Sequence, residues 1–492
     1  MRRKFLTNLI LLVSLNFLIK PFWVFGIDRN VQNMVGPSEY GFYFTIFNFA
    51  FIFQILLDMG ITNYNNRNIA QHNHLLSKHF SSIIILRFLF AIIYMAFILG
   101  VGTLMEYNSR QMYFLVIIGI NQFLLSLILY LRSNISALLH FKTDSFLSIL
   151  DRLIMILICS ILLWGGLTKE PFQISWFIYS QTAAYSITAL IAFGLLLRRM
   201  QFKGLNWNPA FFLMTIKKSF PYALLILFMS MYSRIDTVLI ERLLPNGDRQ
   251  AGIYASAFRL LDVANNMSGF LIAGLLLPLF AKMIKEKKDL SQLVKLGFTL
   301  IFLLSSAVAI ASYFYGEPII RLLYHRHFTE SITAFGNRIT ETALVFQLLM
   351  VVYIFTSATY IFGTLLTANG SLKQLNRVAL IGVILSFSIN FLLIPHFQAV
   401  GSAWANIAAQ GVTALLQLIL AFSILPIHFE KSYLLRLLTY ILFIGFVAWF
   451  SVQLPLLWIY QLGLFILLTI ATAFILKLLN LKAFVQIIQY EK

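Results

Sequence analysis

The stretch SSIIILRFLFAIIYMAFILGVG, residues 81–102, decides the fold class. It holds a single charged residue, Arg87, and is otherwise almost wholly apolar. About twenty helical residues cross the hydrocarbon layer of a bilayer, so this run predicts a membrane-spanning helix. A β-barrel strand is excluded because its apolar and polar residues would alternate, and these do not.

Similar runs recur along the whole chain of 492 residues, which is 60% hydrophobic and only 11% charged. A soluble protein would carry roughly 25% charged residues to cover its surface. The sequence therefore predicts an all-α polytopic membrane protein. We expect about fourteen spans, near residues 5–26, 40–60, 81–102, 111–131, 145–166, 173–196, 219–240, 252–277, 293–313, 342–367, 377–394, 399–421, 434–452 and 457–476. The first begins like a signal peptide but lacks a small-residue cleavage site, so we expect it to be retained.

Loop charge predicts the orientation of the spans. If the N-terminus is cytoplasmic, about 24 Lys and Arg residues fall in inner loops and about 8 in outer loops. Because cytoplasmic loops are enriched in Lys and Arg, both termini are expected to be cytoplasmic and the number of spans even. The same loops explain the net charge of +19, so no nucleic-acid binding is inferred from it.

Residues that could carry catalysis are not grouped. Cys159 is the only cysteine and lies within a predicted span, so it indicates no disulfide or thiol chemistry. His72, His74 and His79 lie close together in a short loop, which we interpret as a solvated polar loop rather than a metal site. The sequence has no phosphate loop, zinc-binding His–Glu helix or nucleophile elbow. We therefore expect a transporter that is not an enzyme and has no cofactor or metal.

Two adjacent predicted spans each contain an Arg and an Asp, at a depth where charge is costly. Arg234 and Asp236 are two residues apart, about 200° around a continuous helix, so they would not pair with each other. Arg259 and Asp262 are three residues apart and share a helical face. Two polar residues extend that face: Ser256 and Asn266. Three interpretations stay open: an ion-pair network that only holds helices together, a cationic cavity for an anionic substrate, or side chains that snorkel to the membrane surface.

The first predicted span carries two further basic candidates. Lys20 precedes Pro21, which opens the helix and frees carbonyl groups, and Asn16 lies one turn earlier on the same face. Arg29 is expected at the outer mouth of this span.

Three other charged residues lie closer to predicted span ends. Arg87 is near the start of its span, so snorkelling explains it as well as a functional role does. The same alternative holds for Asp151 and Arg152, which we place near a cytoplasmic end.

Neutral polar residues follow one face of several predicted spans at helical spacing. In the span near 342–367 these residues are Tyr353, Ser357, Tyr360, Thr364 and Thr367. In the span near 399–421 they are Ser402, Asn406, Gln410, Thr413 and Gln417. In the span near 173–196 they are Gln181, Tyr185 and Thr188. Such faces either hold helices together or line a hydrated interior.

An internal repeat indicates two halves of six spans each. Residues 39–51, EYGFYFTIFNFAF, and residues 250–262, QAGIYASAFRLLD, share a Gly-x-Tyr-x-x-x-Phe pattern at a constant offset of 211. The two last spans carry no charge between Leu437 and Leu476, so we expect them to be peripheral and to face lipid. The expected domains are therefore residues 1–200, 201–425 and 426–492: two six-helix bundles, then two added helices with the tail.

Residues 35–71, VGPSEYGFYFTIFNFAFIFQILLDMGITNYNNRNIAQ, resemble the second-span signature of bacterial polysaccharide flippases of the Wzx type. The matching positions are Gly36, Tyr40, Gly41, Asp58, Gly60 and Arg67. Residues 251–262, AGIYASAFRLLD, are similar to the corresponding segment of that family's second half, and residues 317–331, EPIIRLLYHRHFTES, resemble its outer segment after the ninth span.

The resemblance implies a MATE-like fold and alternating access in the bacterial inner membrane. It implies movement of an undecaprenyl-diphosphate-linked oligosaccharide to the outer leaflet for surface polysaccharide such as O-antigen, beside a polymerase and glycosyltransferases. Candidate partners of the diphosphate are Arg234, Arg259, Lys20, Arg29 and Arg87. Asp236 or Asp262 would bind a coupling H⁺ or Na⁺. Polar cavity candidates are Asn16, Asn266, Ser357, Tyr360, Asn406 and Gln410.

Other functions remain as alternatives. A lipid II flippase would share the cationic cavity, and only the sugar would differ. A multidrug exporter of the same fold would need buried carboxylates without several buried Arg residues. A membrane glycosyltransferase or polymerase would show large outer loops, whereas no loop here exceeds about thirty residues.

Overall fold

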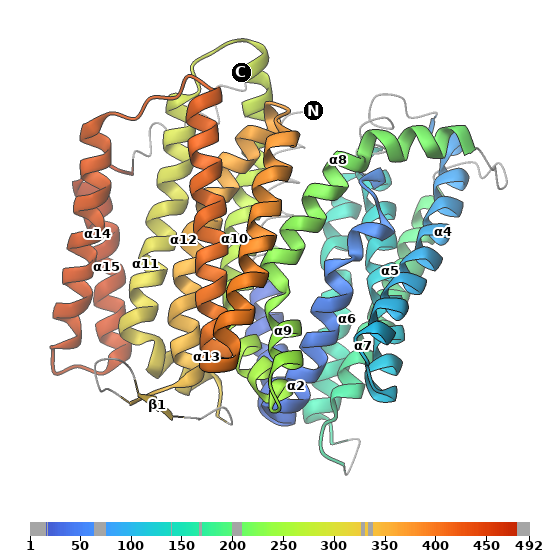
Figure 1. Ribbon diagram of the computed structural model, residues 1–492, viewed down its shortest axis with the longest axis horizontal. Coiled ribbons are helices and arrows are strands. Elements are labelled where there is room, and N and C mark those ends of the chain that lie inside the picture. Colours follow the sequence, from blue (N-terminus) through green and yellow to red (C-terminus); the bar gives the residue numbers. More distant parts are fainter. Residues whose placement is uncertain are drawn as a thin grey trace. The chain divides into compact units, whose positions relative to one another are not determined.

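A computed structural model describes residue 16 and residues 18–62, 75–138, 140–166, 170–198, 209–325, 330–332 and 338–479. These residues are almost entirely helical (Figure 1). The only strands among them are β1 (Glu330–Ile332) and β2 (Arg338–Thr340), which pair antiparallel with Ser331 opposite Ile339. The predicted all-α class is confirmed, with one short strand pair added.

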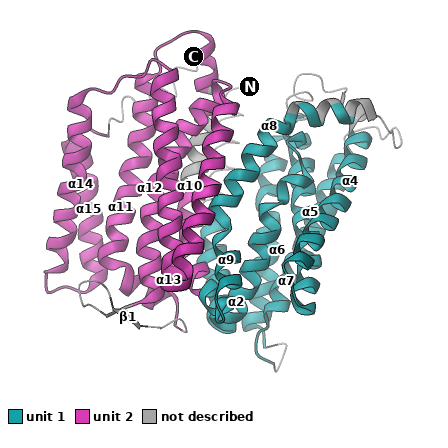
Figure 2. Cartoon of the chain, in the orientation of Figure 1, with its two compact units in different colours: residues 1–252 teal, residues 253–492 magenta. Residues whose placement is uncertain are grey.

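The chain forms two compact units, residues 1–252 and 253–492 (Figure 2). Unit 1 contains η1 (Trp23–Asp28), α2 (Arg29–Ile52), η2 (Gln54–Leu57), α4 (Leu75–Leu104), α5 (Ser109–Ala137), α6 (Phe141–Trp164), α7 (Ile174–Leu197), α8 (Pro209–Arg234), α9 (Asp236–Leu243) and the start of α10 (Gly247–Lys285). Unit 2 contains the rest of α10, then α11 (Ser291–Leu323), α12 (Glu341–Ala368), α13 (Leu372–Ile424), α14 (Lys431–Val452) and α15 (Trp458–Ile475). The predicted domains 1–200, 201–425 and 426–492 follow the span count rather than packing, and they stay a prediction.

Within the described residues, nine helices are long and apolar enough to cross a membrane, and α8 with α9 forms a tenth as a bent pair. The nine are α4, α5, α6, α7, α11, α12, α13, α14 and α15. Helix α13 covers two predicted spans, and its backbone leaves the helical region at Gln398, where φ is 52°. The prediction of a polytopic helical membrane protein is confirmed.

The first predicted span ends later than expected. We placed its end near residue 26, but helical structure continues through the π-helical segment η1 to Val35. The break comes at Gly36, with φ 83°, immediately before Pro37. A residue before proline avoids the α region, and glycine adopts positive φ at low cost. Arg29 therefore lies inside a helical run, about two turns before the break.

The seventh predicted span is not one continuous helix. It breaks at Ile235 into α8 and α9, which are bent by 48°. The expected angle of 200° between Arg234 and Asp236 was therefore wrong, because it assumed unbroken helical geometry. Helix α2 bonds across the break: Thr45 Oγ1 donates to the Thr237 carbonyl at 3.3 Å, and a neighbouring amide donates to the Thr237 hydroxyl at 3.0 Å. Backbone groups freed within a membrane need such partners.

The sequence repeat has the same hydrogen bond in both copies. In unit 1, Gln181 Nε2 of α7 donates to Tyr43 Oη at 2.7 Å. In unit 2, Asn406 Nδ2 of α13 donates to Tyr254 Oη at 3.1 Å. Each tyrosine ring also contacts the phenylalanine four residues later, with centroids 5.9 and 5.7 Å apart. The tyrosine of each repeat thus ties the second span of its half to the sixth.

The two glycines of the repeat mark a close helix crossing within unit 1. A Cβ atom added to Gly41 would lie 1.9 Å from the carbonyl oxygen of Asp248. One added to Gly252 would lie 1.9 Å from the carbonyl oxygen of Pro37. Only glycine lets the backbones of α2 and α10 approach this closely.

Helices α14 and α15 lie at the edge of unit 2 and pack on α11 (Figure 1). Tyr440 Oη donates to the Leu303 carbonyl at 3.3 Å, and the hydroxyls of Tyr315 and Ser451 are 2.6 Å apart. The other faces of the two helices carry exposed apolar side chains, among them Leu434, Leu435, Leu438, Leu442, Ile466, Leu467 and Ile470. This is the surface that a lipid-facing helix presents.

Candidate functional site

Arg234 is the last residue of α8 and lies against α2. Its guanidinium carbon lies 4.5 Å from the ring centroid of Phe51, and its Nη1 donates to Asn48 Oδ1 at 3.2 Å. Both neighbours are neutral, so they orient the half-buried guanidinium without cancelling its charge. Asp236, just beyond the break, is 1% exposed.

The candidates on α10 belong to unit 2. Arg259 and Asp262 are both half-buried, and Asn266 is exposed and donates to the Asp262 carbonyl at 2.8 Å. One residue earlier, Asn265 Oδ1 accepts from the hydroxyl of Thr356 on α12 at 2.7 Å. The two arginines at membrane depth that begin and follow the repeat therefore lie in different units, each with local contacts of its own.

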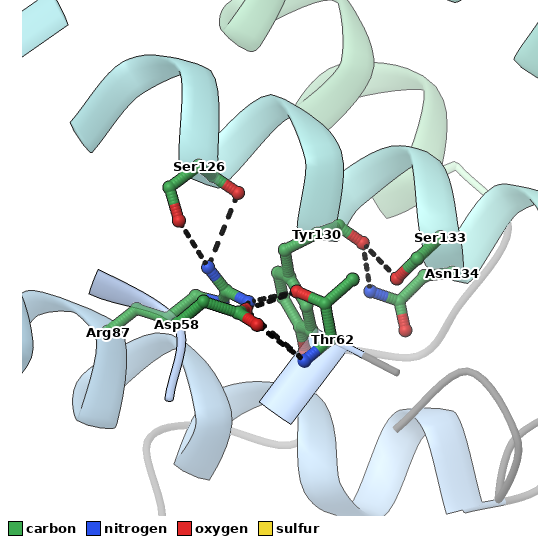
Figure 3. A network of polar contacts seen from close by, with 7 residues as sticks. All are labelled: Asp58, Thr62, Arg87, Ser126, Tyr130, Ser133 and Asn134. Carbon is green, nitrogen blue, oxygen red and sulfur yellow. Dashed lines mark hydrogen bonds and ion pairs between the residues drawn. The ribbon is translucent and has the colours of Figure 1, made fainter. Parts of the chain in front are cut away.

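Arg87 is 1% exposed and pairs with Asp58 (Figure 3). Its guanidinium also donates to the Thr62 hydroxyl and, at 3.0 Å, to Ser126 Oγ, and it lies 4.4 Å from the ring centroid of Tyr130. The Thr62 amide in turn donates to the Asp58 carboxylate at 3.2 Å. Arg87 thus joins the turn after η2 to α4 and α5, and these contacts include no other candidate residue.

The first-span candidates lie along α6. Asn16 is buried and donates to Ser148 Oγ at 3.1 Å. Lys20, one turn later, is exposed, and Arg29 is half-buried at the start of α2.

The polar faces of α12 and α13 are largely buried. Ser357, Asn406 and Gln410 are at most 5% exposed, whereas Tyr360 is half-buried. Asn406 takes part in the repeat bond described above. These side chains contribute to packing between spans, and they stay candidates for a polar interior.

The structure adds a buried carboxylate that the sequence did not single out. Asp28, the last residue of η1, is 1% exposed. It accepts from Tyr40 Oη at 2.9 and 3.0 Å and from Gln32 Nε2 at 3.1 Å. It was missed because we ended the first span at residue 26. The available signal was Gln32, an amide one turn later on the same helical face.

Metal chemistry gains no support from the described residues, where no three His, Cys, Asp or Glu side chains are grouped to hold a metal ion. Arg67, His72 and His74 lie outside those residues, as does the side chain of His79. Cys159 is buried.

Two units of apolar helices, with charged and polar side chains inside the spans, define a polytopic α-helical membrane protein of transporter type. The chain belongs to the polysaccharide biosynthesis protein family, whose sequence profile matches residues 6–284. No curated protein sequence matches the chain.

Solved structures show the same fold at low identity. Lipid II flippase MurJ in an inward closed conformation has a TM-score of 0.64, with 15% identity over 95% of this chain and 98% of its own. An inward-facing multidrug resistance MATE family transporter of the MOP superfamily has a TM-score of 0.60, with 13% identity over 84% and 95%. A MOP superfamily transporter from Pyrococcus furiosus has a TM-score of 0.59, with 13% identity over 85% and 94%. The expected MATE-like fold is confirmed.

Proposed function

We propose that this protein is a flippase that moves an undecaprenyl-diphosphate-linked oligosaccharide from the cytoplasmic to the outer leaflet for surface polysaccharide. The family match carries the proposal, and the fold shared with a lipid II flippase supports it. Movement would proceed by alternating access and be coupled to H⁺ or Na⁺ through Asp236 or Asp262. A polymerase and glycosyltransferases would act on the same lipid-linked substrate.

The chemistry of Arg234 and Arg259 fits a diphosphate. A diphosphate must not enter bare hydrocarbon, and a guanidinium binds phosphate oxygens in a two-pronged, charge-assisted way. Phe51 and Asn48 hold the Arg234 guanidinium in place before any substrate arrives. The lipid tail would stay in the bilayer, and neutral polar side chains such as Ser357 and Gln410 would meet the sugar hydroxyls.

The charge at membrane depth favours an anionic substrate over a cationic drug. A lipid II-type substrate carries the same diphosphate and remains the second candidate, because only the sugar would differ. The family match favours the polysaccharide precursor over lipid II.

Replacing Arg234 or Arg259 with Ala is expected to abolish surface polysaccharide while the protein still reaches the membrane. A hydrogen bond to a charged group contributes about 1.5–3 kcal/mol, so substrate affinity should fall roughly tenfold to a hundredfold. Lys should restore only part of the function, since it cannot bind phosphate in two-pronged fashion. Polysaccharide on whole cells and precursor retained in the membrane are the measurements.

The matched control for these variants is Arg321→Ala, which removes an arginine whose exposed side chain pairs with Glu317 on the same helix. It should make normal polysaccharide. Normal polysaccharide from both the Arg234 and Arg259 variants would show that the cationic site is not needed for transport.

The proposed orientation places both termini in the cytoplasm of a bacterial cell, in its inner membrane. A Cys→Ser change at residue 159, combined with Lys285→Cys, provides one exposed thiol at the lysine-rich end of α10. We expect a membrane-impermeant thiol reagent to label it only after the cells are opened. Asn246→Cys, exposed just before the other end of α10, is the control and should be labelled in intact cells. The reverse pattern would overturn the topology.

A further inference from the structure

One face of the first span lies along one face of α6, and two basic side chains meet between them. At one end, Asn16 Nδ2 donates to Ser148 Oγ at 3.1 Å. At the other, the guanidinium carbon of Arg152 lies 5.5 Å from the ring centroid of Trp23. Lys20 lies between residues 16 and 23 at helical spacing, and residue 152 lies one turn after residue 148. The two contacts therefore bracket Lys20 and direct its face toward Arg152.

Both basic side chains are accessible. Lys20 is exposed, and the Arg152 side chain is 27% exposed. Arg152, Asp151 and Arg132 are the charged groups that act on Lys20. Arg132 Nε is bonded to Asp144 at 2.8 Å, whereas Arg152 Nε is 3.6 Å from the carboxylate of Asp151.

The depth of Arg152 differs from the sequence prediction. We placed Asp151 and Arg152 near the end of a span that began at residue 145. Helix α6 begins at Phe141 and ends at Trp164, so Arg152 lies at its middle. A snorkelling side chain belongs near a helix end, and this interpretation was wrong for Arg152.

Two facing cations at this depth repel each other in a medium of low dielectric, and an anion bound between them removes that repulsion. Trp23 fixes the Arg152 guanidinium from one side and is itself stacked on Phe177, with centroids 5.8 Å apart. A guanidinium stacked on a ring keeps its hydrogen-bonding edges in its plane, which suits phosphate oxygens.

We propose that Lys20 and Arg152 form an anion site within unit 1 that binds the diphosphate of the transported lipid. The inference rests on the proposed function and adds Arg152, which sequence reasoning had set aside, to the substrate-binding residues. Lys20 neutralises charge as a compact ammonium, and Arg152 binds two oxygens of one phosphate.

The test is binding of undecaprenyl diphosphate without sugar, and separately of inorganic diphosphate, to the purified full-length protein in nanodiscs. We expect Lys20→Ala and Arg152→Ala each to raise the Kd about tenfold or more. The double variant should lose less than the product of the two single losses, because both side chains bind one group. Arg152→Lys should fall between wild type and Arg152→Ala. Lys142→Ala removes an exposed charge from the start of α6 and should leave the Kd unchanged.

The outcomes separate this site from the proposed function. Dependence on both residues with both ligands assigns the site to the diphosphate itself, and dependence with the lipid alone assigns it to the lipid headgroup; either result supports the site. Wild-type binding with Kd values of the two Ala variants within twofold of wild type overturns the site and leaves the proposed function standing. No binding by the wild type overturns the proposed substrate. If Arg152→Ala does not fold, Lys20→Ala and Arg152→Lys still decide, because each keeps one of the two charges.

Discussion

Replacing Arg87 with Ala is expected to destabilise the protein by about 3–5 kcal/mol, the usual cost of leaving one partner of a buried ion pair without the other. Asp58 would keep its charge beside an apolar gap, and the Thr62 and Ser126 hydroxyls would lose a charged donor. The Tyr130 ring would also lose its cation. The measurement is the thermal unfolding midpoint of the purified protein in detergent, followed by intrinsic fluorescence.

The matched control is Arg110→Ala, because Arg110 also pairs with a carboxylate of unit 1, Glu39, but with side chains 51% and 41% exposed. An exposed pair contributes about 0–1 kcal/mol, so this midpoint should hardly move. Combining Arg87→Met with Asp58→Asn removes both charges and should recover much of the loss. Equal midpoints for Arg87→Ala and Arg110→Ala would show that the network in Figure 3 does not stabilise the fold. The expected loss of transport in Arg87→Ala would then have to come from substrate contact instead.

Replacing Gly41 or Gly252 with Ala is expected to be the other strongly disruptive change. The added methyl group would lie 1.9 Å from a carbonyl oxygen of the facing backbone, so α2 and α10 would have to move apart. Overpacking of this kind costs about 1–3 kcal/mol or more, and rigid backbone on the other side leaves little room to adjust. We expect a lower unfolding midpoint and less protein in the membrane for either variant.

Gly194→Ala on α7 is the control, because a Cβ there would meet nothing within 4 Å. A helical Gly→Ala change without a clash stabilises by roughly 0.5–1 kcal/mol. If Gly41→Ala unfolds at the same temperature as Gly194→Ala, the close crossing does not exist in the protein.

Apolar run length was enough to predict the helical spans, because lipid leaves the backbone no other way to satisfy its hydrogen bonds. The Gly-x-Tyr-x-x-x-Phe repeat also had a physical meaning that its short length concealed: the tyrosine bonds to an amide, and the glycine permits a backbone crossing. Local sequence encodes these features directly.

The features that were missed depend on distant partners. No proline or glycine marks the break at Ile235, which Thr45 and Asn48 stabilise from another helix. The π-helical segment that carries Asp28 into the interior depends on contacts of η1 with Tyr40 rather than on its own residues. Arg152 was judged by its distance from a span end that lay four residues earlier than predicted.

The tyrosine–amide bonds also measure how the two halves differ in length. Tyr43 and Tyr254 are 211 positions apart, whereas Gln181 and Asn406 are 225 apart, so the second half is 14 residues longer between these landmarks. The connection from α4 to α5 holds 4 residues, from 105 to 108, and the corresponding one from α11 to α12 holds 17, from 324 to 340. Nearly the whole surplus therefore falls in the segment that carries β1 and β2. A chain in which residues 324–340 are shortened to the length of 105–108 would have halves of almost equal length, and its transport would show whether the surplus serves the common mechanism or only the second half.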